Sequence, residues 1–187
     1  MDYYALVNDP TFFTLLLNID KDTSSEFRRK GCVECQSVLH AANFERKVTG
    51  LPGGTPEEVA IRFSFCCSGE NCRKRHTPPS VRFLTGRRYL AVIFVLASVF
   101  HHGVTTGRVD EVAAAADVSR SSIRRWLQWW RDMLPKSTFW RAHQSCLHTV
   151  SPTAMPSSLF AAFVAGSALE VMTGMLRFLG RFGHTDS

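Results

Sequence analysis

The spacing of the cysteines constrains this chain more than any other feature. Cys32 and Cys35 form a C-x2-C pair, and Cys66, Cys67 and Cys72 follow after a turn-rich insert. Two cysteine pairs gathered around one ion are a common way for a short segment to build a tetrahedral thiolate site. Four sulfur ligands leave no open coordination position, so such a site stabilises a fold and does not catalyse. The spacing therefore predicts structural zinc, Zn²⁺.

The second half of the ligand set has alternatives. Cys66 and Cys67 are adjacent, so their side chains are expected to point to opposite sides and only one can face the metal. Cys67 is favoured because it begins the turn that leads to Cys72. The predicted metal ligands are Cys32, Cys35, Cys67 and Cys72, with His40 and His76 in reserve. Cys146 stands alone and is predicted to be a buried apolar side chain.

Composition and charge indicate a folded protein with an anionic partner. The chain has 187 residues, 45% of them hydrophobic and 20% charged, which is ordinary for a globular protein. Its net charge of +6 favours nucleic acid, with membrane headgroups second. A zinc ion with four thiolates would lower this charge to roughly +4. The first residues lack the pattern of a secretory signal, so we expect a cytoplasmic protein whose thiols bind metal.

Two apolar stretches are too short or too charged for membrane spans. Residues 89–100 are predicted to form a buried core helix. Residues 159–182 contain Glu170, Arg177 and Arg181, which are costly in lipid, and are predicted to form one C-terminal helix capped by Ser157 or Ser158. Its apolar face is predicted to support a homodimer through Phe160, Phe163, Val164, Val171, Met175 and Phe178.

The expected fold is mainly α with a small β zinc ribbon, a helix-turn-helix core and a C-terminal helix. Asp9-Pro10 marks the start of a long first helix, and residues 59–65 alternate like a strand. We expect an N-terminal acidic helix at 1–30, the zinc ribbon at 31–80, the helix-turn-helix domain at 81–150, and a linker with the final helix at 151–187.

A basic stretch follows the last predicted ligand. Between residues 73 and 88 there are six arginines and lysines and no acidic residue, as phosphate binding requires. The alternative is a solvated face that neutralises the thiolates. The predicted phosphate contacts are Arg73, Lys74, Arg75, Arg87 and Arg88.

Residues 109–126 have the pattern of a helix-turn-helix. Asp117 occupies the turn, where a left-handed backbone is common, and Ser119 is placed to cap the second helix. In this motif the second helix enters the major groove. Trp126 and Trp130 are predicted to face inward, and Trp129 to face the C-terminal helix or a partner. The predicted DNA contacts are Arg120, Ser121, Arg124, Arg125 and Gln128.

These motifs together resemble the zinc-ribbon and helix-turn-helix modules at the front of bacterial transposases. The resemblance rests on Cys32-x-x-Cys35, on the segment from Phe63 to Arg73 and on Ser119 to Trp126, within residues 31–134. It implies binding of double-stranded DNA. Transposase chemistry needs several carboxylates around Mg²⁺, but only Asp132, Glu170 and Asp186 are acidic beyond the motif. We therefore predict no enzyme activity and no catalytic residues.

Two functions follow from these features. The first is a zinc-stabilised DNA-binding protein, a regulator or accessory factor of a mobile element. The alternative is an adaptor that docks its ribbon and final helix onto a larger recombinase or replication protein. Rising salt should weaken DNA binding steeply and an apolar interface much less. A metal-dependent nuclease or hydrolase would require magnesium-dependent turnover.

Overall fold

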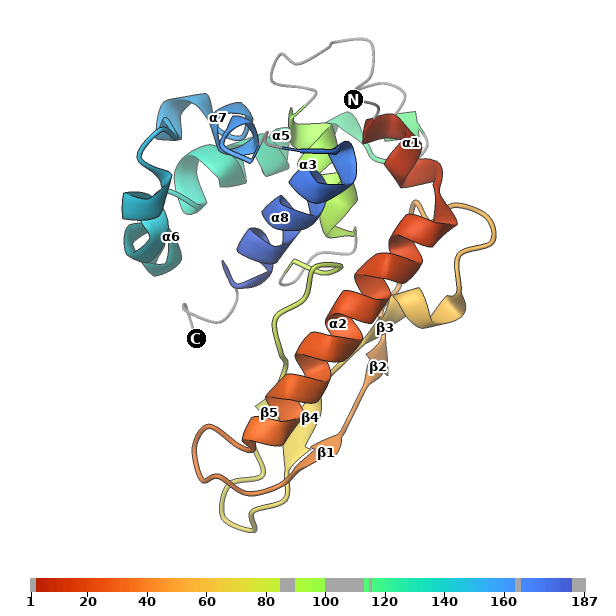
Figure 1. Cartoon of the computed structure of the whole chain (residues 1–187), viewed down its shortest axis with the longest axis vertical. Coiled ribbons are helices and arrows are strands. Elements are labelled where there is room, and N and C mark those ends of the chain that lie inside the picture. The colour runs from red at the N-terminus through yellow and green to blue at the C-terminus, as the bar shows by residue number, and fades with distance from the viewer. Residues whose placement is uncertain (1–2, 85–89, 100–112, 115, 164–165, 183–187) are drawn as a thin grey trace.

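The computed structural model describes residues 3–84, 90–99, 113–114, 116–163 and 166–182. Helices gather at one end of the long axis and short strands at the other, with one long helix running along both (Figure 1). This confirms the expected mainly α fold with a small β region. The helices are α1 (Tyr3–Asn8), α2 (Pro10–Lys30), α3 (Ala91–Val99), α5 (Arg120–Gln128), α6 (Thr138–His143), α7 (Ser157–Ala161) and α8 (Ala168–Gly180). The strands are β1 (Leu39–Ala41), β2 (Phe44–Glu45), β3 (Ile61–Arg62), β4 (Phe65–Cys67) and β5 (Arg75–His76).

Helix α2 begins where the sequence predicts. The Asp9 carboxylate accepts a hydrogen bond from the Thr11 N–H at 2.8 Å, and Pro10 occupies the first helical position. The helix continues to Lys30 and ends at Gly31, whose φ of 76° suits a residue without a side chain. Its first half buries an apolar stripe in the helical body: Phe12, Phe13, Leu16 and Leu17.

The strand predicted at 59–65 is broken. Residues 57–60 form a 3-10 turn, β3 pairs with β2, and β4 pairs with β1 and β5 in a separate antiparallel sheet. The break lies at Ser64. Its N–H donates to the Asn43 side chain at 3.1 Å, and its carbonyl accepts from the Ala42 N–H at 2.8 Å. The two strand pairs consequently belong to two sheets.

The body is built around α3, all of whose residues are buried. The described part of the predicted core helix, residues 91–99, is therefore helical, as expected. Phe94 lies 5.3 Å from the ring centroids of Trp126, Trp129 and Trp130 alike. Trp126 and Trp130 are buried, as predicted, and Trp129 contacts Phe182, just beyond α8.

The C-terminal segment forms two helices, so the prediction of one helix capped by Ser157 or Ser158 was wrong. Ser167 caps α8 in a capping box, with its hydroxyl accepting from the Glu170 N–H and Glu170 accepting from the Ser167 N–H. Phe160, Val171 and Met175 lie in the core of the chain, which gives these members of the predicted dimer face an internal role. Among the described residues, no helix is long and apolar enough to cross a membrane.

A buried ion pair joins α2 to the segment between the two ends of the molecule. Arg82, which belongs to the basic stretch, is wholly buried, and its Nε donates to Asp20 at 2.8 Å. Its Nη1 donates to the Val59 carbonyl at 2.6 Å, and its Nη2 to the Ile61 carbonyl at 2.9 Å. Asp20 also accepts from the Val81 N–H and the Ser80 hydroxyl. This arginine is a structural group and is not free for phosphate.

Candidate metal centre and nucleic-acid surfaces

The first cysteine pair lies in a tight turn directly after α2. The Cys32 N–H donates to the Ser37 carbonyl at 2.9 Å, and the Gln36 N–H donates back to the Cys32 carbonyl at 2.8 Å. Gln36 has a φ of 60°, which a side-chain-bearing residue adopts only where its surroundings hold it there. The turn directs Cys32 into the protein and leaves Cys35 exposed.

The second pair closes in a related way at the end of β4. Gly69 donates its N–H to the Cys67 sulfur at 3.3 Å, and its carbonyl accepts from the Cys72 and Arg73 N–H groups. Arg73, like Gln36 after the first pair, has a positive φ, here 47°. A Cβ at Gly69 would lie 3.2 Å from the Cys35 sulfur, so glycine allows the two turns to meet closely.

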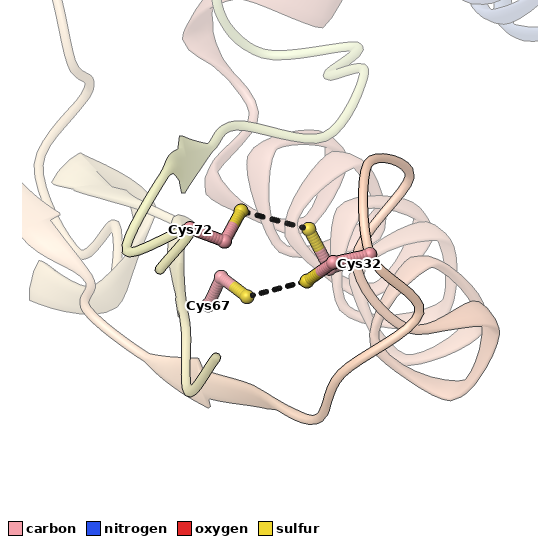
Figure 2. Close-up of side chains that lie close together, drawn as sticks. Cys32, Cys67 and Cys72 are labelled. Atoms are coloured by element: carbon pink, nitrogen blue, oxygen red, sulfur yellow. Dashed lines mark hydrogen bonds between the residues drawn. The ribbon is translucent and has the colours of Figure 1, made fainter. Parts of the chain in front are cut away.

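The two turns bring four sulfurs together, as Figure 2 shows for Cys32, Cys67 and Cys72. The ligand atoms of Cys32, Cys35, Cys67 and Cys72 all lie within 4.8 Å of one another. The Cys32–Cys72 and Cys35–Cys67 sulfur distances are 3.7 and 3.3 Å. Zinc–sulfur bonds of about 2.3 Å in a tetrahedron place sulfurs roughly 3.8 Å apart. The donor set and its spacing are thus compatible with zinc.

Strand pairing decides between Cys66 and Cys67. Cys67 lies opposite the buried Leu39, whereas Cys66 lies opposite the exposed His40 on the other face of the sheet. Cys67 is therefore the residue that faces the cluster. His76 lies beside the set, with its Nε2 3.2 Å from the Cys32 sulfur, where it can donate to a thiolate. Cys146 is exposed, so the prediction that it is buried was wrong.

Two of the thiols differ in their readiness to lose a proton. Hydrogen bonds with the Ser37 side chain and backbone lower the pKa of Cys35 to about 6. Burial raises the pKa of Cys67 to about 12. Metal must therefore displace a proton from Cys67 across the neutral range, whereas Cys35 is already ionised there.

The predicted phosphate contacts beside the cluster are exposed but unequal. Lys74 pairs with Glu34 of the first turn at 3.1 Å. Arg75 lies over the Phe44 ring, 5.6 Å from its centroid, and its Nη2 donates to a carbonyl. Arg73 extends into solvent from the second turn. Arg87 and Arg88 lie outside the described residues.

Three further cations at this end of the molecule were not among the predicted contacts. Arg28, Arg29 and Lys30 form the last turn of α2, next to the first cysteine turn. Their position directly before Gly31-Cys32 indicates in the sequence that they lie beside the metal site. The prediction of an acidic helix at 1–30 overlooked them. We call residues 28–41 and 65–76 the knuckle end.

The second helix of the predicted helix-turn-helix is α5, and its start is as expected. The Ser119 hydroxyl accepts from the Ser122 N–H at 3.2 Å, and Asp117 has a φ of 50°. Val118 donates its N–H to the Ala113 carbonyl at 2.8 Å, which closes the turn. The first helix of the motif falls mostly outside the described residues.

Helix α5 separates apolar from basic side chains. Ile123 and Trp126 are buried against the body. All five predicted DNA contacts on this helix are exposed: Arg120, Ser121, Arg124, Arg125 and Gln128. Figure 1 shows α5 towards one end of the long axis and β4 and β5 towards the other, so the two basic surfaces are well separated.

Comparison of the chain with known protein families, with curated proteins and with solved structures gives no match in any of the three.

Proposed function

We propose that this protein binds double-stranded DNA through α5 and that zinc at the four cysteines stabilises its knuckle end. The observation that carries the proposal is the face of α5: Arg120, Arg124 and Arg125 point outward while Ile123 and Trp126 anchor the helix in the core. A capped helix with its first turns exposed and basic fits the major groove. Arginine there can read guanine or hold phosphate.

Zinc has a structural role in this proposal. The four cysteine sulfurs would occupy all four tetrahedral positions, so the ion would bind no substrate. When bound, it cross-links the turn after α2 to the turn after β4. The protein would act without catalysis, as a regulator or accessory factor of a mobile element, the role that the resemblance to transposase modules suggests.

The test is binding to a random pool of duplex DNA across a salt series. We compare the intact protein with an Arg124→Ala, Arg125→Ala variant and with a Lys136→Ala, Arg141→Ala variant. Lys136 and Arg141 are exposed cations outside α5, so their removal changes the net charge equally.

Enriched sequences and a steep salt dependence are expected for the intact protein. Losing one bidentate arginine should weaken binding to the enriched sequence by about ten- to a hundredfold. The control variant should retain the sequence preference. Absence of binding at low salt by a folded, zinc-loaded sample would refute the proposal.

One observation favours the adaptor as a second candidate. Val33 and Val38 of the first cysteine turn are 65% and 63% exposed, more than any other large hydrophobic side chain among the described residues. An adaptor would use this apolar tip, because much of the apolar face of the C-terminal segment is buried. Capture of a recombinase that is lost in a Val33→Ser, Val38→Ser variant and insensitive to salt would support this candidate.

A further inference from the structure

The turn of the helix-turn-helix lies beside the start of α2. Ala116 lines a small cavity with Val7 and Asn8, the last two residues of α1, and with Gly50. A Cβ on Gly50 would come within 2.8 Å of the Ala116 Cα, so the two backbones are in close contact. The N-terminal end of α5 is therefore tied to the N-terminal end of α2.

The knuckle end lies at the other end of the same helix. Cys32 is two residues beyond Lys30, the last residue of α2. A helix of 21 residues is about 31 Å long at 1.5 Å per residue. The start of α5 and the knuckle end are thus separated by roughly the length of α2.

Contacts in the middle of α2 hold this spacing. Asp20 receives the buried Arg82, which also binds carbonyls of the segment leading into β3. The next residue of the helix, Lys21, pairs with Glu58 at 2.7 Å. These contacts hold the segment that leads into β3 against the middle of α2.

Along α2, positive charge without an acidic partner lies at the ends and not at the middle, where the exposed Lys21 is paired with Glu58. The exposed side chains midway along α2 include Leu15, Asn18 and Asp22, which do not attract phosphate. At the knuckle end, Lys30 pairs with Glu26 and Lys74 with Glu34, and the remaining cations face a thiolate–zinc charge of −2. Arg29 and Arg73 are exposed there and take part in none of these ion pairs.

We propose that the knuckle end is a second phosphate-binding surface, which contacts the same DNA duplex about one helical turn from α5. This inference rests on the proposed function. One turn of B-DNA measures about 34–36 Å, close to the length of α2. Arg29 and Arg73 contact backbone phosphates in this arrangement and read no sequence, while α2 acts as the spacer between the two contacts.

The experiment measures the salt dependence of binding to duplexes of about 12 and about 24 base pairs, the lengths that one contact or both contacts require. The slope of the logarithm of the binding constant against the logarithm of the salt concentration reports how many phosphates the protein neutralises. It does not depend on how many positions along the duplex the protein can occupy. Four proteins are compared: the intact chain, Arg29→Gln with Arg73→Gln, Arg29→Lys with Arg73→Lys, and Lys136→Gln with Arg141→Gln. Zinc content and circular dichroism verify that each is folded.

The intact chain should show a steeper slope on the longer duplex. The double glutamine variant should lose about two units of slope on the long duplex, at about 0.9 per phosphate, and nothing on the short one. The lysine variant should keep the slope, since a point charge suffices for phosphate, and the Lys136, Arg141 variant should keep the length difference.

Two outcomes overturn the inference separately from the proposed function. Equal slopes on both duplexes for the intact chain would show that α5 binds alone. A glutamine variant that still distinguishes the duplexes would show that Arg29 and Arg73 do not make the second contact. If no duplex binds at low salt, the proposed function fails and this inference fails with it.

Discussion

The knuckle end and the helical body are stabilised by different chemistry. In the body, Phe94 of α3 packs against three tryptophans in one continuous apolar cluster. At the knuckle end, the separate buried cluster of described residues consists of Cys32, Leu39, Phe65 and Cys67, and half of these are predicted metal ligands. Its strands are two or three residues long.

This difference shows which part of the fold depends on metal. Burial of large aromatic side chains stabilises the body without help. A cluster of four buried side chains is too small to order the surrounding turns, and metal binding free energy then supplies the stability. The two regions should therefore respond differently to metal removal, to pH and to mutation.

The largest effect should come from removing the metal. Structural zinc sites contribute about 10–16 kcal/mol of apparent binding free energy in small zinc domains. A strong chelator, or Cys72→Ser, should therefore expose the amides of β1, β4 and β5 to hydrogen exchange while those of α3 stay protected. Equal loss of protection in both regions would mean that the body also needs the metal.

The affinity for zinc should also decrease as the pH is lowered, and more steeply below about pH 6 than above it. Zinc must displace the proton of Cys67 throughout the neutral range, but that of Cys35 only below its pKa of about 6. The affinity should hence fall about tenfold more per pH unit below pH 6 than above it. Chelator competition between about pH 5 and 8 measures this. Ser37→Ala should move this change of slope to higher pH, because Cys35 would lose the side-chain hydrogen bond and keep only the backbone one.

Breaking the buried pair should destabilise the junction of the two regions. Asp20→Ala leaves the Arg82 guanidinium buried without its counter-charge, which costs about 3–5 kcal/mol. Urea denaturation measures the loss. Asp22→Ala removes an exposed carboxylate two residues away and should change the free energy of unfolding by less than about 0.5 kcal/mol. Similar losses in both variants would contradict the structural role of the pair.

A smaller effect is expected where the loop of residues 46–56 touches the turn of the helix-turn-helix. Gly50→Ala places a Cβ against the Ala116 backbone at a φ of 80°, at a cost of about 1–3 kcal/mol. Gly53→Ala is the matched control, since a Cβ there meets nothing within 4 Å. Thermal unfolding compares the two, and DNA binding by Gly50→Ala should weaken as well if the turn shifts.

The smallest effect concerns a single helix cap in the body. Ser167→Ala removes the cap of α8 and should cost about 1 kcal/mol. Ser157→Ala should be neutral, because the Ser157 hydroxyl is buried with no hydrogen-bond partner and caps nothing. Chemical denaturation of both variants decides between the observed cap and the position favoured by the sequence.

Features set by neighbouring residues could be predicted from the sequence. The helix start at Asp9-Pro10, the left-handed Asp117 and the Ser119 cap all depend on a few adjacent residues, and the structure has each of them. The capping box at Ser167 and Glu170 was equally readable, since serine precedes glutamate by three positions. Ser157 and Ser158 lack such a partner.

Features set by distant residues could not be predicted. Asp20 and Arg82 are 62 positions apart, and nothing local marks them as a pair. The preference for Cys67 over Cys66 becomes firm only when β4 pairs with β1 and places Cys67 opposite Leu39. The spacing of the cysteines left Cys66 and Cys67 as candidates for the third ligand, and the register of β4 against β1 selected Cys67.

The first half of helix α2 packs in the body and its last turns belong to the knuckle end. The chain therefore cannot be cut at the boundaries between its sequence motifs without separating residues that pack together. A fragment ending at residue 80 would keep α2 but leave Phe12, Phe13 and Leu16 in water, each losing about 1.5–3 kcal/mol of burial. A fragment starting at residue 31 would bury Arg82 without Asp20. Any exchange of modules between genes that preserved this fold would have to transfer both ends together.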